Sequence, residues 1–137
     1  MNGLFVSIGA GPGIGGSTAR RFAREGFDLL LAARDVSKLE PSAQKIRKET
    51  GRHVETVALD AADFSAVQQF SERFGAAASI LHYNAAAIQK LDVLEAPLET
   101  TQRNLSVDIL GALAAIKYFA PYMEQRRKEP FCSLAAA

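Results

Sequence analysis

A glycine-rich stretch near the N-terminus constrains the fold of this chain more than any other feature. Leu4–Ile8 is an apolar run of strand length, and the sequence Gly-Ala-Gly-Pro-Gly-Ile-Gly follows it directly at residues 9–15. Apolar residues then repeat at helical spacing as far as Ala23. A strand, a tight turn and a helix therefore follow one another. The start of such a helix presents backbone N–H groups and a positive dipole end, which attract an anion.

Glycine in the turn lets a phosphate group approach the backbone, because no Cβ stands in the way. The predicted phosphate-turn residues are Gly9, Gly11, Pro12, Gly13, Ile14 and Gly15. The strand before the turn and the helix after it favour the pyrophosphate of a dinucleotide as the ligand. Two alternatives stay open. The glycines serve the turn alone, or the turn holds a mononucleotide or another phosphate-bearing ligand.

Strand-length apolar runs alternate with helical patterns along the whole chain. The predicted strands cover residues 4–8, 27–33, 53–59, 79–83 and 131–134, and a helical pattern follows each of the first four. Nearly continuous apolar runs are typical of parallel strands that helices cover on both faces. The order predicts one dinucleotide-binding domain, residues 1–137, with an α/β fold. Its sheet is parallel and doubly wound, in a three-layer α/β/α, Rossmann-like arrangement.

Two of the predicted helices carry local signals for where they begin or bend. Asp35 or Ser37 is the expected N-cap of the helix after the second strand. The last and longest helix is expected to run from about residue 100 to 127. Pro121 lies inside that helix and is predicted to kink it, because proline removes a backbone donor and crowds the preceding turn.

Three polar residues follow predicted strands directly: Arg34, Asp60 and Asn84. They should gather at one edge of the sheet, because ligands of such folds bind at the carboxyl ends of the strands. Arg34 stands where a dinucleotide fold senses the ribose, and an arginine there favours the 2′-phosphate of NADP. NAD is the alternative cofactor, since the neighbouring Asp35 could accept from a free 2′-hydroxyl while Arg34 stays solvated.

The composition argues against several other classes of function. The formal net charge is +1 and both signs are mixed along the chain, which indicates no nucleic-acid partner and no membrane partner. A single cysteine, Cys132, excludes an internal disulfide and fits a reducing, cytoplasmic location. No apolar stretch is expected to be long enough to span a bilayer, and no signal-peptide pattern is seen. No cysteine and histidine spacing indicates a metal site.

The glycine spacing Gly-x-x-x-Gly-Ile-Gly resembles the signature of the short-chain dehydrogenase/reductase family. Asn84-Ala85-Ala86 resembles the Asn-Ala-Gly that the family carries after its fourth strand, and Gly111 and Pro121 match the spacing of its long helix. The resemblance implies that Asp60, with Ala61 beside it, lies at the adenine ring; a cap of the following turn is the alternative role of Asp60. It also implies that Asn84, Ala85 and Ala86 pack against a ribose, with a turn residue and tight packing as the alternatives.

The resemblance also implies an activity and partners. Members of the family are NAD(P)-dependent oxidoreductases that move a hydride between the nicotinamide and a carbonyl or alcohol carbon of a small molecule. NADP is the expected cofactor, and a homo-oligomer formed through the 100–127 helix is the expected assembly. Asp108 stands at the position of the family's catalytic asparagine, three residues before Gly111. It is a candidate for the proton relay, with a solvated helix residue as the alternative.

The remaining catalytic residues of the family have no counterpart in this sequence. The family's serine would follow the fifth strand, where Ala135, Ala136 and Ala137 stand, and its Tyr-x-x-x-Lys pair would come further on. Tyr122-x-x-x-Arg126 is no substitute, because arginine replaces lysine and the pair precedes the fifth strand. The fold is therefore expected to be incomplete at the C-terminus, with cofactor binding and no turnover. A non-catalytic NAD(P)-binding sensor or regulatory module is the alternative function.

Overall fold

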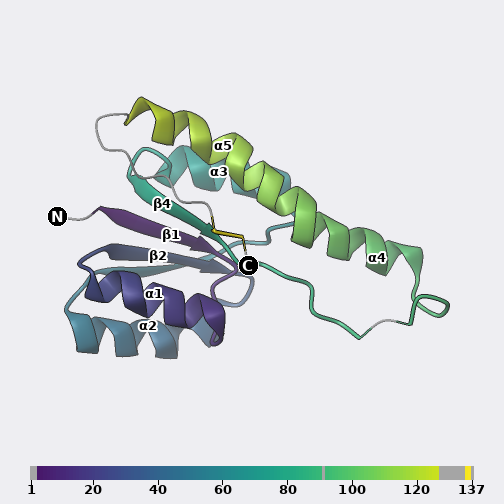
Figure 1. Cartoon of the computed structure of the whole chain (residues 1–137), viewed down its shortest axis with the longest axis horizontal. Helices are drawn as coiled ribbons and strands as arrows, with labels where there is room; N and C mark the ends of the chain where they lie inside the picture. Colours follow the sequence, from purple (N-terminus) through teal and green to yellow (C-terminus); the bar gives the residue numbers. More distant parts are fainter. Residues whose placement is uncertain (1–2, 91, 127–134, 137) are drawn as a thin grey trace.

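The computed structural model describes residues 3–90, 92–126 and 135–136. Its centre is a parallel sheet of five strands in the order β3-β2-β1-β4-β5 (Figure 1). The strands are β1 (Leu4–Ile8), β2 (Asp28–Ala33), β3 (Val54–Ala58), β4 (Ala78–Tyr83) and β5 (Ala135–Ala136). The strand order runs outward in both directions from β1, so the sheet is doubly wound as the alternating sequence predicted.

Helices cover both faces of the sheet (Figure 1). They are α1 (Ile14–Arg24), α2 (Val36–Thr50), α3 (Phe64–Phe74), α4 (Leu98–Leu105), the π-helical segment η1 (Ser106–Leu110) and α5 (Gly111–Gln125). Residues of α1 and α2 share one core cluster with the sheet, and residues of α3 and α5 share the other. The three-layer α/β/α, Rossmann-like prediction is therefore confirmed.

Alternate side chains of β1, β2, β3 and β4 supply the two core layers. Phe5 faces the α1–α2 layer and stacks on Phe22 with ring centroids 4.4 Å apart, whereas Val6 belongs to the α3–α5 layer. In that second layer Phe70 of α3 meets Phe119 of α5 at 5.8 Å between ring centroids. A fully buried side chain such as Phe5 or Phe119 contributes about 1.5–3 kcal/mol to folding. Cover on both faces explains why the apolar runs of the strands are continuous.

The start and end of α2 follow from local chemistry. Asp35 is the N-cap, because its Oδ1 accepts from the Ser37 N–H at 3.0 Å. Ser37 lies inside the helix, so the first of the two predicted caps is correct. The helix ends at Gly51, whose φ of +67° is the left-handed conformation that glycine adopts without steric cost.

The long last helix is irregular at a place that the sequence did not predict. It runs from Leu98 to Gln125 through α4, η1 and α5, and it continues past Pro121 to its end. An irregular turn lies at Ser106–Leu110, where the backbone has π-helical geometry. A side chain explains this position: the Tyr83 hydroxyl donates to the Val107 carbonyl and thereby competes with the regular helical hydrogen bonds.

The same helix has two apolar sides. Gly111, Ala115 and Phe119 are buried against α3 and β4. Leu105, Ile109 and Leu113 lie on another side and remain 49 %, 53 % and 57 % exposed.

One stretch of the described residues, Leu98–Gln125, is long and apolar enough to cross a membrane by length and composition alone. The prediction that no apolar stretch reaches this length is therefore wrong by these two criteria. Its best window has a mean hydropathy of 1.2 and is 28 % buried. Core helices of soluble proteins meet the same two criteria, so the property is weak support for a membrane span.

The C-terminal strand is only partly within the described residues. The predicted strand over 131–134 lies outside them. Ala135 and Ala136 form β5 and pair in parallel with His82 and Tyr83 of β4. Ala135 and Ala136 are two of the three positions at which the family's serine was expected. Both are therefore part of the strand itself.

Candidate cofactor site

A cleft of about 770 Å³ opens along the carboxyl ends of β1, β2, β3 and β4. Its volume lies within the range that small-molecule and cofactor sites usually have. Most of the residues predicted from the sequence meet there: Gly9, Gly11, Pro12, Arg34, Asp60, Ala61, Asn84, Ala85 and Ala86 line it. Gly13 is the N-cap of α1, and Ile14 and Gly15 begin that helix directly after the lining residues. Asp108 does not line the cleft.

Gly9 makes the turn after β1 possible. Its φ is +82°, and a Cβ at this position would lie 2.1 Å from the backbone nitrogen of Ala85. Only glycine tolerates both the positive φ and this approach of two main chains. The Gly9 N–H donates to the Ala32 carbonyl at 2.9 Å, so the turn is also fixed to the end of β2.

Gly11 and Gly13 differ from Gly9 because they face open space. A Cβ at either position would meet no heavy atom within 4 Å. The helix that follows, α1, has no side-chain N-cap and no acidic residue in its first turn, whereas α2 and α3 are capped by Asp35 and Asp63. An uncapped helix start beside open glycine backbone is well suited to an anion such as a phosphate group.

Asn84 connects the end of β4 to the glycine turn. Its backbone N–H donates to the Ile8 carbonyl at 2.8 Å, and its side-chain Nδ2 donates to the Gly9 carbonyl at 3.4 Å. A Cβ on Gly15 would lie 3.2 Å from the same Nδ2. Asn84 therefore holds the turn in place. The small side chains of Ala85 and Ala86 leave the adjoining part of the cleft open.

Arg34 and Asp35 differ in whether their charged side chains already have partners in the protein. Arg34 is exposed, lines the cleft, and has no hydrogen bond or ion pair with the other described residues. Asp35 Oδ1 accepts from both the N–H and the hydroxyl of Ser37, at 3.0 and 2.5 Å. The hydroxyl bond from Ser37 is the main reason that the pKa of Asp35 lies below its usual value, with Lys38 contributing. The free cation at this point of the cleft is thus Arg34.

Asp60 follows β3 and is held from two sides. Its Oδ1 accepts from the Ala62 N–H at 3.0 Å, and its Oδ2 accepts from Nη2 of Arg103 in α4 at 2.8 Å. Partial burial raises the pKa of Asp60, but the hydrogen bonds from Arg103 and Ala62, together with the charges of Arg103 and Arg34, outweigh it and lower the pKa overall. The carboxylate is therefore ionised throughout the neutral range.

The segment after β4 is attached to the π-helical turn. Oδ1 of Asp108 accepts from the Ala87 N–H at 2.7 Å. The Tyr83 hydroxyl donates to the Val107 carbonyl, and burial together with the charges of Asp108 and Asp60 raises the pKa of Tyr83 to about 12. The hydroxyl therefore stays protonated and can act as that donor. A Cβ on Gly111 would lie 2.3 Å from the same hydroxyl oxygen, so the helix needs glycine there.

Sequence reasoning missed one wall of the cleft. Glu99, Arg103 and Val107 line it from α4 and η1, and their neighbours Thr100 and Asn104 do so as well. Spacings of four residues on a helix that starts after Pro97 place these side chains on one face. This periodicity was available in the sequence, but nothing in the sequence indicated that this face turns toward the strand ends. Within residues 3–90 and 92–126, no three metal-ligating side chains gather at one place.

The fold and the cleft together define a class of protein. A doubly wound parallel sheet with a glycine turn after its first strand, and a ligand-sized cleft along its carboxyl edge, is the architecture of nucleotide-binding Rossmann-like proteins. Comparison with known protein families identifies the family within this class. Residues 4–129 match the family described as short chain dehydrogenase. The chain belongs to this family, as the sequence resemblance predicted.

Named relatives are similar over most of this chain. An uncharacterized oxidoreductase, YxbG of Bacillus subtilis, is 32 % identical over 126 residues, which are 89 % of this chain and 46 % of the relative. Mouse retinol dehydrogenase 12 is 42 % identical over 80 residues, or 58 % of this chain and 25 % of the relative. The chain therefore spans about half the length of the first of these relatives, and less of the second.

Solved structures give the same result. The L-sorbose reductase of Gluconobacter frateurii, in complex with NADPH and L-sorbose, is 29 % identical with a TM-score of 0.83, over 91 % of this chain and 49 % of that structure. An alcohol dehydrogenase of Thermococcus sibiricus, in complex with 5-hydroxy-NADP, is 31 % identical with a TM-score of 0.79, over 90 % of this chain and 54 % of that structure.

Proposed function

We propose that residues 1–137 are the cofactor-binding domain of a short-chain oxidoreductase that transfers a hydride between a nicotinamide dinucleotide and a carbonyl or alcohol carbon of a small molecule. The observation that carries the proposal is the open glycine turn at the uncapped start of α1, beside a cleft of about 770 Å³. When bound, the cofactor supplies or accepts the hydride. The residues of this chain bind and orient it.

The cofactor takes a definite direction along the cleft in this proposal. Its pyrophosphate lies against the residue 9–15 turn, where Gly11 and Gly13 leave room for oxygen atoms beside the backbone. The adenine lies toward Asp60 and Ala61, and a ribose lies beside the Asn84–Ala86 segment. These placements rest on the resemblance to the family and on the lining of the cleft.

NADP is the proposed cofactor, with NAD as the alternative. Arg34 is exposed and unpaired among the described residues, so it can donate to a 2′-phosphate. Asp35, which would accept from the free 2′-hydroxyl of NAD, already accepts from Ser37. The NADPH and 5-hydroxy-NADP bound to two similar oxidoreductases support the same choice.

Calorimetric titration of the chain with NADPH and with NADH tests this proposal. NADPH should bind more tightly, and Arg34→Asp should weaken NADPH binding by about ten-fold or more, because charge-assisted hydrogen bonds contribute about 1.5–3 kcal/mol each. Lys48→Asp is the matched control, since Lys48 is exposed on α2 and does not line the cleft. Negligible binding of both cofactors to the folded chain would refute the proposal. An unchanged NADPH preference in Arg34→Asp would refute the assignment of Arg34.

For catalysis we propose binding without turnover by these residues. The sequence contains neither the family's Tyr-x-x-x-Lys nor its serine after the fifth strand. Asp108, at the family's asparagine position, is proposed to act by positioning, because its carboxylate holds the Ala87 N–H at the end of the ribose segment. A non-catalytic NAD(P) sensor is the alternative function. The two are separated by following NADPH oxidation by the whole protein in the presence of simple aldehydes and ketones. The oxidoreductase would support it and the sensor would not, whereas residues 1–137 alone would support it in neither case.

We also propose that the chain forms homo-oligomers in the cytoplasm through its long helix. Leu105, Ile109 and Leu113 form an exposed apolar stripe along that helix, about half exposed at each residue. Sedimentation should give a mass above that of one chain, and Ile109→Asp should reduce it to that of a monomer. A monomeric wild-type chain at micromolar concentration would refute this assembly.

A further inference from the structure

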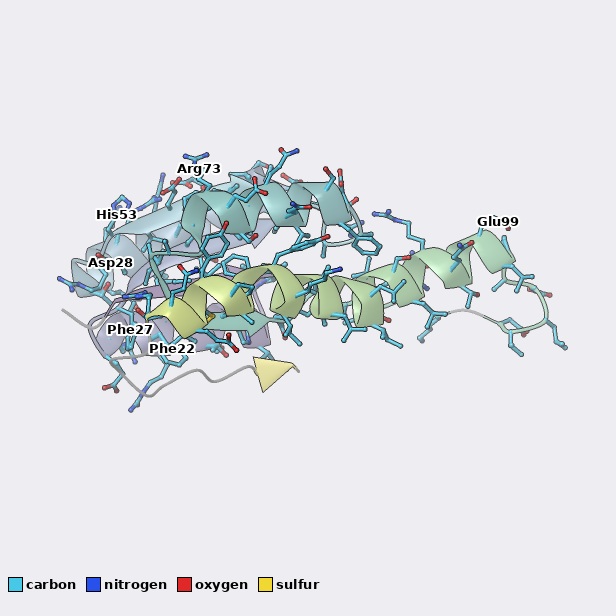
Figure 2. The ribbon with its side chains drawn as sticks, turned by 90° about the horizontal axis from the view of Figure 1, so that it is seen from above. Phe22, Phe27, Asp28, His53, Arg73 and Glu99 are labelled. Carbon is cyan, nitrogen blue, oxygen red and sulfur yellow. The ribbon has the colours of Figure 1, made fainter. Side chains whose placement is uncertain are left out.

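The contact between Asp60 and Arg103 joins two parts of the molecule that are far apart in the sequence. Asp60 lies at the carboxyl edge of the sheet, and Arg103 lies on α4, 43 residues later. In Figure 1 α4 extends beyond the end of the sheet, on the side where the cleft residues lie. Figure 2 shows Glu99 close to the far end of this projection. None of the described residues of α4 is buried.

The Arg103–Asp60 pair is what holds α4 by side-chain hydrogen bonding. Within the part of the chain that the structure describes, it is the one side-chain hydrogen bond between α4 and any other element or loop. The two further hydrogen bonds to this region, from Tyr83 to Val107 and from Ala87 to Asp108, reach η1 instead. Since α4 buries no residue, this pair and the continuation of the helix into η1 and α5 are what fix this wall of the cleft.

The pair also orients the carboxylate. Each oxygen of an ionised aspartate has two lone pairs. The Ala62 N–H takes one on Oδ1 and Arg103 takes one on Oδ2, at 3.0 and 2.8 Å. One lone pair on each oxygen is left for a donor in the cleft. Because both oxygens are anchored, the carboxylate cannot rotate freely before a ligand arrives.

We propose that Arg103 is a positioning residue for the adenosine end of the cofactor, acting through Asp60. It fixes the Asp60 carboxylate to accept from the exocyclic amine of the base, and it holds α4 as the wall that closes the cleft on that side. This inference rests on the proposed function, and it adds a residue that lies on neither the glycine turn nor the strand ends. Arg103 differs from Arg34 in its partner: Arg103 is paired with Asp60, whereas Arg34 is free among the described residues to meet a phosphate.

A double-mutant cycle on NADPH binding tests the proposal. Arg103→Met keeps the aliphatic length and removes the guanidinium, and Asp60→Asn removes the charge of its partner. The Arg103 and Asp60 side chains are 50 % and 37 % exposed, so the expected loss in affinity for Arg103→Met is about two- to five-fold. In the Asp60→Asn background the same substitution should change the affinity by less than about two-fold. Equal losses in both backgrounds would overturn the proposal, because Arg103 would then act independently of Asp60.

Fragments of the cofactor provide a second readout that a general loss of stability would not reproduce. Arg103→Met should weaken binding of 2′,5′-ADP and 5′-AMP and leave binding of nicotinamide mononucleotide unchanged. Arg103→Lys, which keeps the charge but loses the guanidinium geometry, should recover part of the loss. Equal weakening of all three fragments would contradict the assignment to the adenosine end.

Hydrogen exchange of residues 98–105 tests the second half of the proposal without any ligand. Exchange there should be faster in Arg103→Met than in the wild-type chain, and unchanged exchange would refute the role of Arg103 in holding α4. Arg73→Met is the matched control, since Arg73 of α3 pairs with Glu55 at 3.7 Å and lies far from α4 (Figure 2). Failure of wild-type NADPH binding would refute the proposed function. Normal wild-type binding with an unaffected Arg103→Met chain would refute the role of Arg103 alone.

Discussion

Replacing Gly9 with alanine should destabilise this protein through two separate terms. The first is conformational: a φ of +82° costs an L-residue about 1–2 kcal/mol relative to glycine. The second is steric, because the new Cβ would lie 2.1 Å from the Ala85 nitrogen and 2.3 Å from its Cα. Both atoms belong to the main chain just after β4, and main-chain atoms cannot move aside like the end of a flexible side chain. Overpacking of this kind costs about 1–3 kcal/mol.

The sum predicts that Gly9→Ala lowers the free energy of unfolding by about 2–5 kcal/mol. Gly51→Ala separates the two terms. Gly51 also has a positive φ, of +67°, but its Cβ would meet no atom within 4 Å. Gly51→Ala should therefore show the conformational cost alone, about 1–2 kcal/mol.

Urea denaturation of the two variants and the wild-type chain, followed by far-ultraviolet circular dichroism, measures both losses. The slope of the free energy against urea concentration should be the same for all three chains. If Gly9→Ala loses no more stability than Gly51→Ala, the turn at residues 9–15 does not approach the main chain of Ala85 this closely in solution, and the steric term is refuted.

Three further predictions concern the core, the long helix and the cleft. Burial lowers the pKa of His82, whose Nδ1 lies 3.0 Å from the Ser7 hydroxyl, below 6.5. The unfolded chain therefore binds the proton more readily, and the free energy of unfolding should fall as the pH drops below about 6.5. The dependence should be weaker in His82→Gln, as urea denaturation at about pH 7.5 and about pH 5.5 would measure. Gly111→Ala should lower the free energy of unfolding by about 1–3 kcal/mol. Tyr83→Phe should recover part of this loss in a double-mutant cycle, because it removes the oxygen that the new Cβ would meet at 2.3 Å. Purely additive losses would contradict this contact. Gly11→Ala should leave the melting temperature nearly unchanged and weaken NADPH binding by about ten-fold or more, since its Cβ would fill open space at the phosphate turn; unchanged affinity would place the phosphate elsewhere.

Much of the fold could be predicted from the sequence because its signals are local. The run Phe-Asp-Leu-Leu-Leu-Ala-Ala at residues 27–33 is nearly all apolar, and a strand of that kind is stable only when both faces are covered. Asp35 and Gly51 mark the ends of α2 through bonds and torsions within a few residues. The start of this helix was therefore predicted to within the two candidates Asp35 and Ser37, and its end at Gly51 follows from equally local chemistry.

The long helix shows where local signals fail. Pro121 lies inside α5, and the helix continues through it to Gln125. The irregular turn at Ser106–Leu110 depends on the Tyr83 hydroxyl, which belongs to β4, 24 residues earlier in the chain. No propensity of the residues in the turn itself indicates such a contact, because the donor reaches the helix only after sheet and helix have packed together.

The candidate site likewise has a part that the sequence predicted and a part that it did not. The sequence by itself determined the glycine turn, the alternation of strands and helices along the chain, and the three polar residues Arg34, Asp60 and Asn84 at the strand ends, because strand direction in a parallel sheet brings successive carboxyl ends to one edge. Only the tertiary structure decided that Arg103 reaches Asp60, and that α4 forms a wall of the cleft. Those contacts depend on where a helix with no buried residue of its own comes to lie, and that position follows from packing elsewhere in the molecule.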